Sequence, residues 1–244
     1  MEEKELIEEL VNAVLAHSKT VRFKAQAIVT YNVEVGNLEL VKLEKGIELI
    51  KVKRKLDLMN EYKANNNEID YFAIEEIIKD EMVKFENEYI AMKDFLYLSN
   101  EIANGEEITD EEDDELDELY TRIVREFHPL LDGLNNDESK KRFEKVRENF
   151  VNYDLEGLKV YEDVLFDEKH PIDPYLIKLE IEKLNLEVKR LLEEFPLNKV
   201  DEDNNLDFSA QIANAKQEID QIDMQIKEFE EKIEEFYPVI GLEC

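Results

Sequence analysis

Apolar residues recur at alternating steps of four and three in the last third of the chain, and this is the clearest pattern in the sequence. Such heptad spacing predicts a helix whose apolar stripe packs against a partner helix. Two stripes follow one another, separated by the polar stretch from Pro196 to Asp207. We therefore expect an antiparallel coiled-coil hairpin over residues 169–244. The first stripe comprises Ile177, Ile181, Leu184, Val188, Leu191 and Phe195, and the second comprises Phe208, Ile212, Ala215, Ile219, Ile222, Ile226, Phe229, Ile233 and Phe236.

Residues 1–105 show the same periodicity and predict an N-terminal region of long helices. One helix should end near Asn65–Asn67, and the next should end around Asn104 and Gly105, where glycine can adopt the left-handed conformation that terminates helices. A shorter helix is expected to precede them. The apolar stripe of the short helix comprises Leu6, Leu10 and Val14. The stripe of the second helix comprises Val29, Val33, Gly36, Leu40, Leu43, Ile47 and Ile50. The stripe of the third helix comprises Ile78, Met82, Phe85, Tyr89, Met92 and Leu96.

The central segment, residues 106–168, predicts a third helical region built from shorter helices. The first should end at His128–Pro129, because proline disfavours helical backbone in the residue before it. A second amphipathic helix, DESKKRFEKVRENF, presents Phe143, Val146 and Phe150 on one face. A third short helix is expected to follow Asp154, with Leu155, Leu158, Tyr161 and Leu165 facing inward. The whole chain is therefore predicted to be all-α.

Composition narrows the classes of function. The 244 residues carry 31 basic and 62 acidic side chains, which gives a formal net charge of -31. Such a charge disfavours direct nucleic-acid binding, because phosphates are neutralised by lysine and arginine. No stretch is apolar enough for a membrane span, and the acidic start differs from a signal peptide, so we expect a cytoplasmic protein that contacts no membrane. The single cysteine, Cys244, excludes an internal disulfide.

Signatures of catalysis and of cofactor binding are missing from the sequence. It contains no phosphate-binding glycine loop, no dinucleotide fingerprint, no HExxH zinc motif and no GxSxG nucleophile motif. The three histidines, His17, His128 and His170, are far apart, so a metal site would need three unrelated segments to converge. We therefore expect no enzyme activity, no catalytic residues, no metal and no cofactor.

Residues 106–118 include ten acids and no base. Thr109 followed by Glu112 fits a capping box, and acids in the first turn of a helix complement its dipole, so a solvated helix start is expected there. An acidic patch that docks a partner is the alternative. The basic residues Lys140, Lys141, Arg142, Lys145 and Arg147 form a local positive cluster, which we expect to face this acidic stretch. Binding of an anion or of a partner is the alternative for this cluster.

The segment from Leu116 to Leu165 resembles helices two and three of the J domain of DnaJ-type co-chaperones. The likeness lies in LYTRIVREFHP, a loop, and KKRFEKVRENF. In that family the turn between the two helices reads His-Pro-Asp, and its aspartate engages the ATP-driven heat-shock chaperone. Here Leu130 takes the place of that aspartate, and Asp132 lies two residues further on. The first helix of the family is not recognisable.

The resemblance implies a degenerate J-like domain at residues 106–168, with one set of residues that binds a partner and another that forms the core. The partner-binding set would be Arg122, Arg125, His128, Pro129, Leu130 and Asp132, and the core would be Tyr120, Ile123, Phe127, Phe143, Val146 and Phe150. It further implies an adaptor or co-chaperone that binds protein partners through its helical arms, with weak or no chaperone stimulation. The alternative is a coiled-coil scaffold that self-associates through its heptad seams. A third possibility is an acidic mimic of nucleic acid that captures basic partners.

Overall fold

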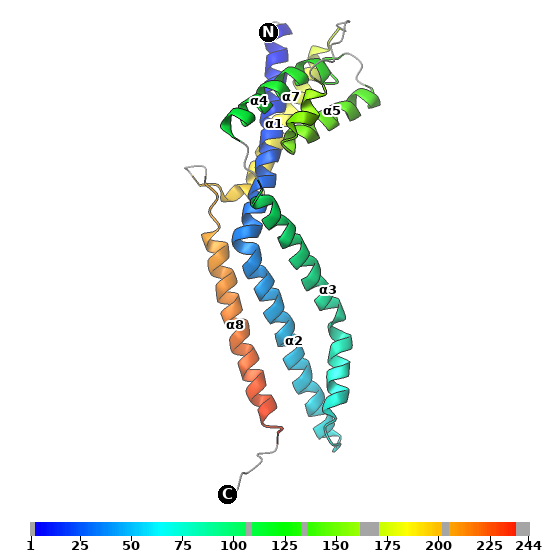
Figure 1. The fold of residues 1–244 in the computed structure, drawn as a ribbon, viewed down its shortest axis with the longest axis vertical. Helices are drawn as coiled ribbons and strands as arrows, with labels where there is room; N and C mark the ends of the chain where they lie inside the picture. The colour runs from blue at the N-terminus through cyan, green and yellow to red at the C-terminus, as the bar shows by residue number, and fades with distance from the viewer. Residues whose placement is uncertain (1–2, 106–108, 133–135, 162–170, 202–204, 238–244) are drawn as a thin grey trace. The chain divides into compact units, whose positions relative to one another are not determined.

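The computed structural model describes residues 3–105, 109–132, 136–161, 171–201 and 205–237, and these are almost entirely helical (Figure 1). The all-α prediction is confirmed, since 84% of the described residues are helical. The described residues contain no strand, and an isolated antiparallel bridge joins Val200 to Leu206. The elements are α1 (Glu3–Tyr31), the π-helical η1 (Asn32–Gly36), α2 (Asn37–Ala64), α3 (Tyr71–Ala103), α4 (Asp110–Phe127), α5 (Asp137–Val151), α6 (Leu155–Lys159), α7 (Pro174–Glu193), the 3₁₀ turn η2 (Leu197–Lys199) and α8 (Ser209–Glu234).

The chain forms two compact units whose boundaries differ from the predicted ones. Unit 1 combines the chain up to Ile28 with Gly105–Leu206, and unit 2 combines Val29–Asn104 with the chain from Asp207 onward. The predicted division at residues 105 and 168 treated each stretch of sequence as a separate region. Both units instead bring together helices that are distant in the sequence, because their apolar stripes are completed by distant partners.

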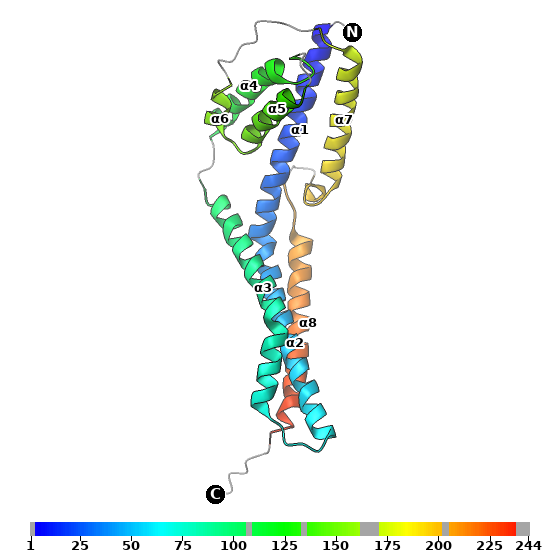
Figure 2. The same cartoon turned by 90° about the vertical axis from the view of Figure 1, so that its right-hand side faces the viewer.

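Unit 2 consists of η1, α2, α3 and α8, with α2 in contact with both α3 and α8 (Figure 2). Its core includes Met59, Ile74 and Ile233, one from each of the three α-helices. The predicted pairing of the stripe on α8 with the stripe on α7 is wrong, because α8 packs against α2 and α7 belongs to unit 1. A heptad stripe specifies an apolar face but not which helix will cover it.

Unit 1 groups the start of α1 with α4, α5, α6 and α7 (Figure 2), and side chains from these helices form one apolar cluster. The cluster includes Leu10 of α1, Tyr120 of α4, Phe150 of α5 and Ile177 of α7. The start of α7 follows the sequence signals, because Pro174 occupies the first turn and Asp173 accepts a hydrogen bond from Tyr175 N–H at 2.9 Å. The seam predicted for α7 is thus used inside unit 1.

The predicted short leading helix is wrong in extent, since α1, η1 and α2 follow one another without an intervening loop. The sequence between Val14 and Val29 contains no proline or glycine, so nothing there stops a helix. The π-helical segment includes Gly36, which is buried where α3 approaches. A π-helical turn accommodates one extra residue and thereby rotates the residues that follow it.

Two helical glycines, Gly36 and Gly46, provide a matched test of the close approach between η1 and α3. A Cβ on Gly36 would lie 2.4 Å from Leu96 Cδ2, whereas a Cβ on Gly46 would meet no atom within 4 Å. We expect Gly46→Ala to raise the free energy of unfolding by about 0.5–1 kcal/mol, because alanine is the better helix former. Gly36→Ala should lower it by about 1 kcal/mol or more, because the buried Leu96 must move. Hydrogen exchange of α2 amides in both variants checks the two signs, and equal signs would contradict the role assigned to Gly36.

Candidate functional site

The J-like segment forms a helical hairpin in which α4 packs against α5 and α6. Tyr120 and Phe150 are completely buried, and their rings stack with centroids 4.0 Å apart. Phe127 meets Tyr161 edge-on at 5.6 Å, which joins the end of α4 to the segment after α6. The structure brings the residues predicted for the J-like core into one apolar cluster: Tyr120, Ile123, Phe127, Val146 and Phe150 are buried, and Phe143 packs against them. Leu165, also predicted to face inward, lies outside the described residues.

The turn after α4 folds back into unit 1. The carbonyl oxygen of His128 accepts hydrogen bonds from the N–H groups of Leu131 and Asp132, at 2.7 Å and 2.9 Å. The N–H of Leu130 donates to His128 Nδ1 at 3.3 Å. His128 is 5% exposed, Pro129 is buried and Leu130 is half-buried. The histidine and proline are therefore not available at the surface.

Asp132, the acid nearest to this turn, has an internal partner. Its side chain is fully buried, and its Oδ2 lies 3.0 Å from the Nη2 of Arg142 on α5. The same guanidinium lies over the ring of Phe127 at 5.1 Å. A buried carboxylate of this kind needs its cation, because an unpaired charge inside a protein is very unfavourable. The arrangement ties the turn to α5.

Arg122 and Arg125 are the predicted partner-binding residues whose side chains are exposed. Arg125 donates from Nη2 to Glu8 Oε2 of α1 at 2.7 Å. Surface pairs of this type contribute little stability, so Arg125 can exchange its partner. The six predicted partner-binding residues therefore do not form one exposed patch, because His128, Pro129 and Asp132 are buried.

The predicted pairing between the basic cluster on α5 and the acidic stretch is not observed among the described residues. Asp113 of α4 lies 3.0 Å from Arg22 of α1, and Asp117 pairs with Lys19 and Arg22 of the same helix. On α5, Arg142 pairs with Asp132. The predicted Thr109 capping box is confirmed, with Glu112 N–H donating to Thr109 Oγ1 at 3.2 Å.

Arg22 connects α1 to the J-like hairpin, and the sequence analysis did not identify it. Its side chain is buried, and its guanidinium lies between the rings of Phe150 and Tyr153, at 4.7 Å and 4.6 Å. One turn earlier on α1, the hydroxyl of Ser18 shares a hydrogen bond of 2.8 Å with that of Tyr120. The signal in the sequence was the pair of bases Lys19 and Arg22 on the leading helix, which offered an alternative partner for the acidic stretch.

A cavity of about 280 Å³ lies beside the His-Pro turn. It is lined from four elements, including His17 of α1, His128 of the turn, Arg147 of α5 and Lys183 of α7. His17 Nε2 lies 3.1 Å from Glu187 Oε2 of α7. Two of the three histidines thus meet at one cavity, although His170 lies outside the described residues. Within the described ranges, no three His, Cys, Asp or Glu side chains are grouped as a metal site would require.

Both cavity histidines are poor bases in the folded protein. Burial, reinforced by the positive charge of Lys183, lowers the pKa of His128 to about 4. Burial and then Arg147 lower the pKa of His17, and Glu187 opposes this only in part. Both side chains are therefore neutral at pH 7, and the cavity gains no positive charge from them.

These shifts predict a loss of stability in mild acid. An unfolded histidine has a pKa of about 6.5, so between about pH 6.5 and 4 the unfolded chain binds protons that folded unit 1 does not. Unit 1 should therefore be fully stabilised above this window and lose stability as the pH falls through it. Urea titrations across the window measure how the free energy of unfolding changes with pH. In His128→Gln this change should be smaller than in the unmodified chain, by the equivalent of up to about one bound proton. Parallel slopes in the two proteins would contradict the assignment to His128.

No protein-family model, curated protein or solved structure matches this chain. The J-like interpretation therefore rests on the residues and the geometry of the hairpin. Within the described part of the chain, none of the helices has both the length and the apolar composition needed to cross a membrane.

Proposed function

We propose that the protein is a non-enzymatic adaptor that binds other proteins through its helices, and that its J-like hairpin is a structural module which does not stimulate the heat-shock chaperone. The observation that carries this proposal is the burial of the His128–Pro129 turn. A chaperone would have to contact this turn directly, and such a contact requires an exposed surface.

The charges around the turn support the same proposal. Leu130 supplies no carboxylate, and the buried carboxylate of Asp132 is held by Arg142. On the surface of α4, the exposed acids Glu118 and Glu126 accompany Arg122 and Arg125. A mixed surface of this kind gives little electrostatic steering towards an acidic partner.

Self-association through the heptad seams has less support. The seam residues Ile177, Ile181 and Leu184 of α7 belong to the apolar cluster of unit 1, and Ile233 of α8 belongs to that of unit 2. Both seams are thus largely covered within a single chain, and Phe195 is the seam residue that is exposed, at 44%. Assembly through them would first require these residues to leave their cores, which is unfavourable.

An ATPase assay with the cognate ATP-driven heat-shock chaperone tests the proposal. We expect the chain to leave the basal rate of hydrolysis unchanged, while a J-domain protein with an intact His-Pro-Asp turn accelerates it in the same assay. Several-fold stimulation by the unmodified chain that is abolished in His128→Gln would contradict the proposal. Stimulation that appears only in Leu130→Asp would support the missing carboxylate as its cause.

A further inference from the structure

The last turns of α3 carry an exposed apolar surface. We define the α3 apolar patch as Ile90, Phe95, Tyr97, Leu98 and Ile102, whose side chains are 53%, 54%, 64%, 60% and 67% exposed. In unit 2, α3 packs on α2 and η1 and buries Leu96 there. The patch residues point away from that contact and remain accessible.

The size and spacing of the patch indicate a binding surface for a helix. Single exposed apolar residues are ordinary, but several large ones gathered on one helix mark an interaction site. Ile90 and Tyr97 are seven residues apart, and Phe95, Leu98 and Ile102 follow at steps of three and four. Side chains at these steps form two rows, one of Ile90 and Tyr97 and one of Phe95, Leu98 and Ile102, which together cover the exposed side of α3. A docked amphipathic helix contacts its partner through rows of this kind.

The charges around the patch specify the character of the partner. Between Glu86 and Ile102 the acids are Glu86, Glu88, Asp94 and Glu101 and the base is Lys93. Glu86 and Glu88 already pair with Lys51 and Lys84. Asp94 lies one turn from both Ile90 and Leu98, and Glu101 lies one turn from Tyr97. Among the residues that the structure describes, neither Asp94 nor Glu101 has an ion-pair partner. Basic side chains on a partner would find these carboxylates available.

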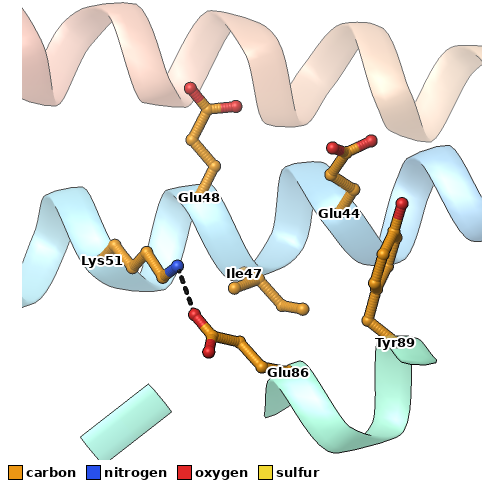
Figure 3. Close-up of a pocket in the computed structure, with 6 residues that line it drawn as sticks. All are labelled: Glu44, Ile47, Glu48, Lys51, Glu86 and Tyr89. Carbon is orange, nitrogen blue, oxygen red and sulfur yellow. Dashed lines mark hydrogen bonds and ion pairs between the residues drawn. The ribbon is translucent and has the colours of Figure 1, made fainter. Parts of the chain in front are cut away.

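A groove rich in glutamate lies between α2 and the part of α3 that precedes the patch in the sequence (Figure 3). It has a volume of about 440 Å³ and is lined by Glu44, Ile47, Glu48 and Lys51 of α2 and by Glu86 and Tyr89 of α3. Lys51 Nζ reaches Glu86 Oε1 at 2.8 Å, and Glu86 lies one turn before Ile90. Ile47 and Tyr89 can contact the aliphatic stem of a lysine or arginine while Glu44 faces its charge, since Glu48 and Glu86 already pair with Lys45 and Lys51.

We propose that the α3 apolar patch docks an amphipathic helix of another protein that has apolar residues at helical spacing and basic residues on its flanks. This inference rests on the proposed adaptor function and names the chemistry of its partner. A second copy of the chain fits poorly, because pairing two such patches would bring Asp94 and Glu101 against the same acids in a chain of net charge -31.

Synthetic peptides of about 18 residues, roughly five helical turns, provide the test. The first is an amphipathic helix of leucine and lysine, the second has the same composition in scrambled order, and the third keeps the leucines but replaces lysine with glutamate. Binding to the full chain is followed by fluorescence anisotropy between about 50 mM and about 300 mM salt. We expect the amphipathic basic peptide to bind and the other two to bind at least about ten-fold more weakly.

Variants of the chain locate the binding. The double variant Tyr97→Gln/Leu98→Gln should weaken binding of the amphipathic basic peptide about ten-fold. The double variant Asp94→Lys/Glu101→Lys should also weaken binding and should make the affinity less dependent on salt. Leu179→Gln with Leu186→Gln changes exposed apolar residues of α7, 53% and 69% accessible, and should leave affinity unchanged. The Asp94→Lys/Glu101→Lys variant leaves the apolar patch unchanged. It therefore tests the binding site even if the Tyr97→Gln/Leu98→Gln variant alters the helicity of α3.

Several results would overturn the inference. Equal binding of the scrambled peptide would show general charge attraction, and equal binding of the acidic peptide would show general apolar adhesion. Dimerisation in sedimentation experiments that Leu98→Gln abolishes would assign the patch to a second copy. Failure of all peptides to bind, with no chaperone stimulation in the ATPase assay, would remove this partner assignment while leaving the non-stimulating J-like module in place.

Discussion

Truncating Phe150 to alanine is expected to lower the free energy of unfolding of unit 1 by about 3–5 kcal/mol. Phe150 is completely buried, its ring stacks on that of Tyr120, and the guanidinium of Arg22 lies over its other side. The substitution removes all three contacts and leaves a cavity. Because the rings come from α5 and α4 and the cation from α1, the loss should weaken three helices together. Hydrogen exchange of amides in α4 and α5 measures it.

Phe72→Ala supplies the matched control, because the same side chain is 77% exposed on α3. It should change stability by less than about 0.5 kcal/mol. Amides of α2 and α8 in unit 2 should keep their protection in Phe150→Ala. If Phe150→Ala cost no more than Phe72→Ala, the stacked arrangement at the centre of the hairpin would be wrong.

Removing the cation from the buried pair at the turn should also destabilise unit 1 strongly. We expect Arg142→Met to lower the free energy of unfolding by about 2–4 kcal/mol, because it removes the cation that neutralises the fully buried carboxylate of Asp132. The loss should stay near the lower end, since the Arg142 side chain is 26% exposed and water already weakens the pair. Methionine keeps most of the volume over Phe127, so packing changes little. Urea denaturation at pH 7 measures the effect.

A double-mutant cycle separates the charge from its surroundings. Adding Asp132→Asn to Arg142→Met removes the negative charge whose cation was lost and should recover part of the stability. Arg125→Met, which breaks the exposed pair with Glu8, should cost less than about 1 kcal/mol. If Arg142→Met and Arg125→Met had equal effects, Asp132 would not depend on an internal partner, and its carboxylate could again be considered for contact with a chaperone.

Local signals in the sequence located the ends of helices well. The predicted stops near Asn65 and Asn104 agree with α2 ending at Ala64 and α3 ending at Ala103, and Thr109 caps α4 as expected. These features depend on neighbouring residues, so the sequence contains their cause. The six core residues of the hairpin were found for the same reason, because periodicity identifies the buried face of each helix.

The choice of partner helices could not be predicted in this way. The stripe on α8 would have suited α7 as well as α2, and the stripe on α7 is covered by a cluster that includes Leu10 of α1. Burial of His128 likewise depends on contributions from α1 and α7, which lie far away in the chain. Such contacts depend on the combined shape of several helices, and the periodicity of any one of them contains no information about it.

The discontinuous composition of unit 1 has a consequence for biosynthesis. Residues up to Ile28 emerge from the ribosome well before the helices that complete their core, which begin after Gly105. Because synthesis proceeds at about 5–20 residues per second, the apolar face of α1 remains uncovered for on the order of ten seconds before α4 has been made. During that interval the nascent chain exposes Leu6, Leu10 and Val14 to chaperones and proteases, and α8 of unit 2 is synthesised later still.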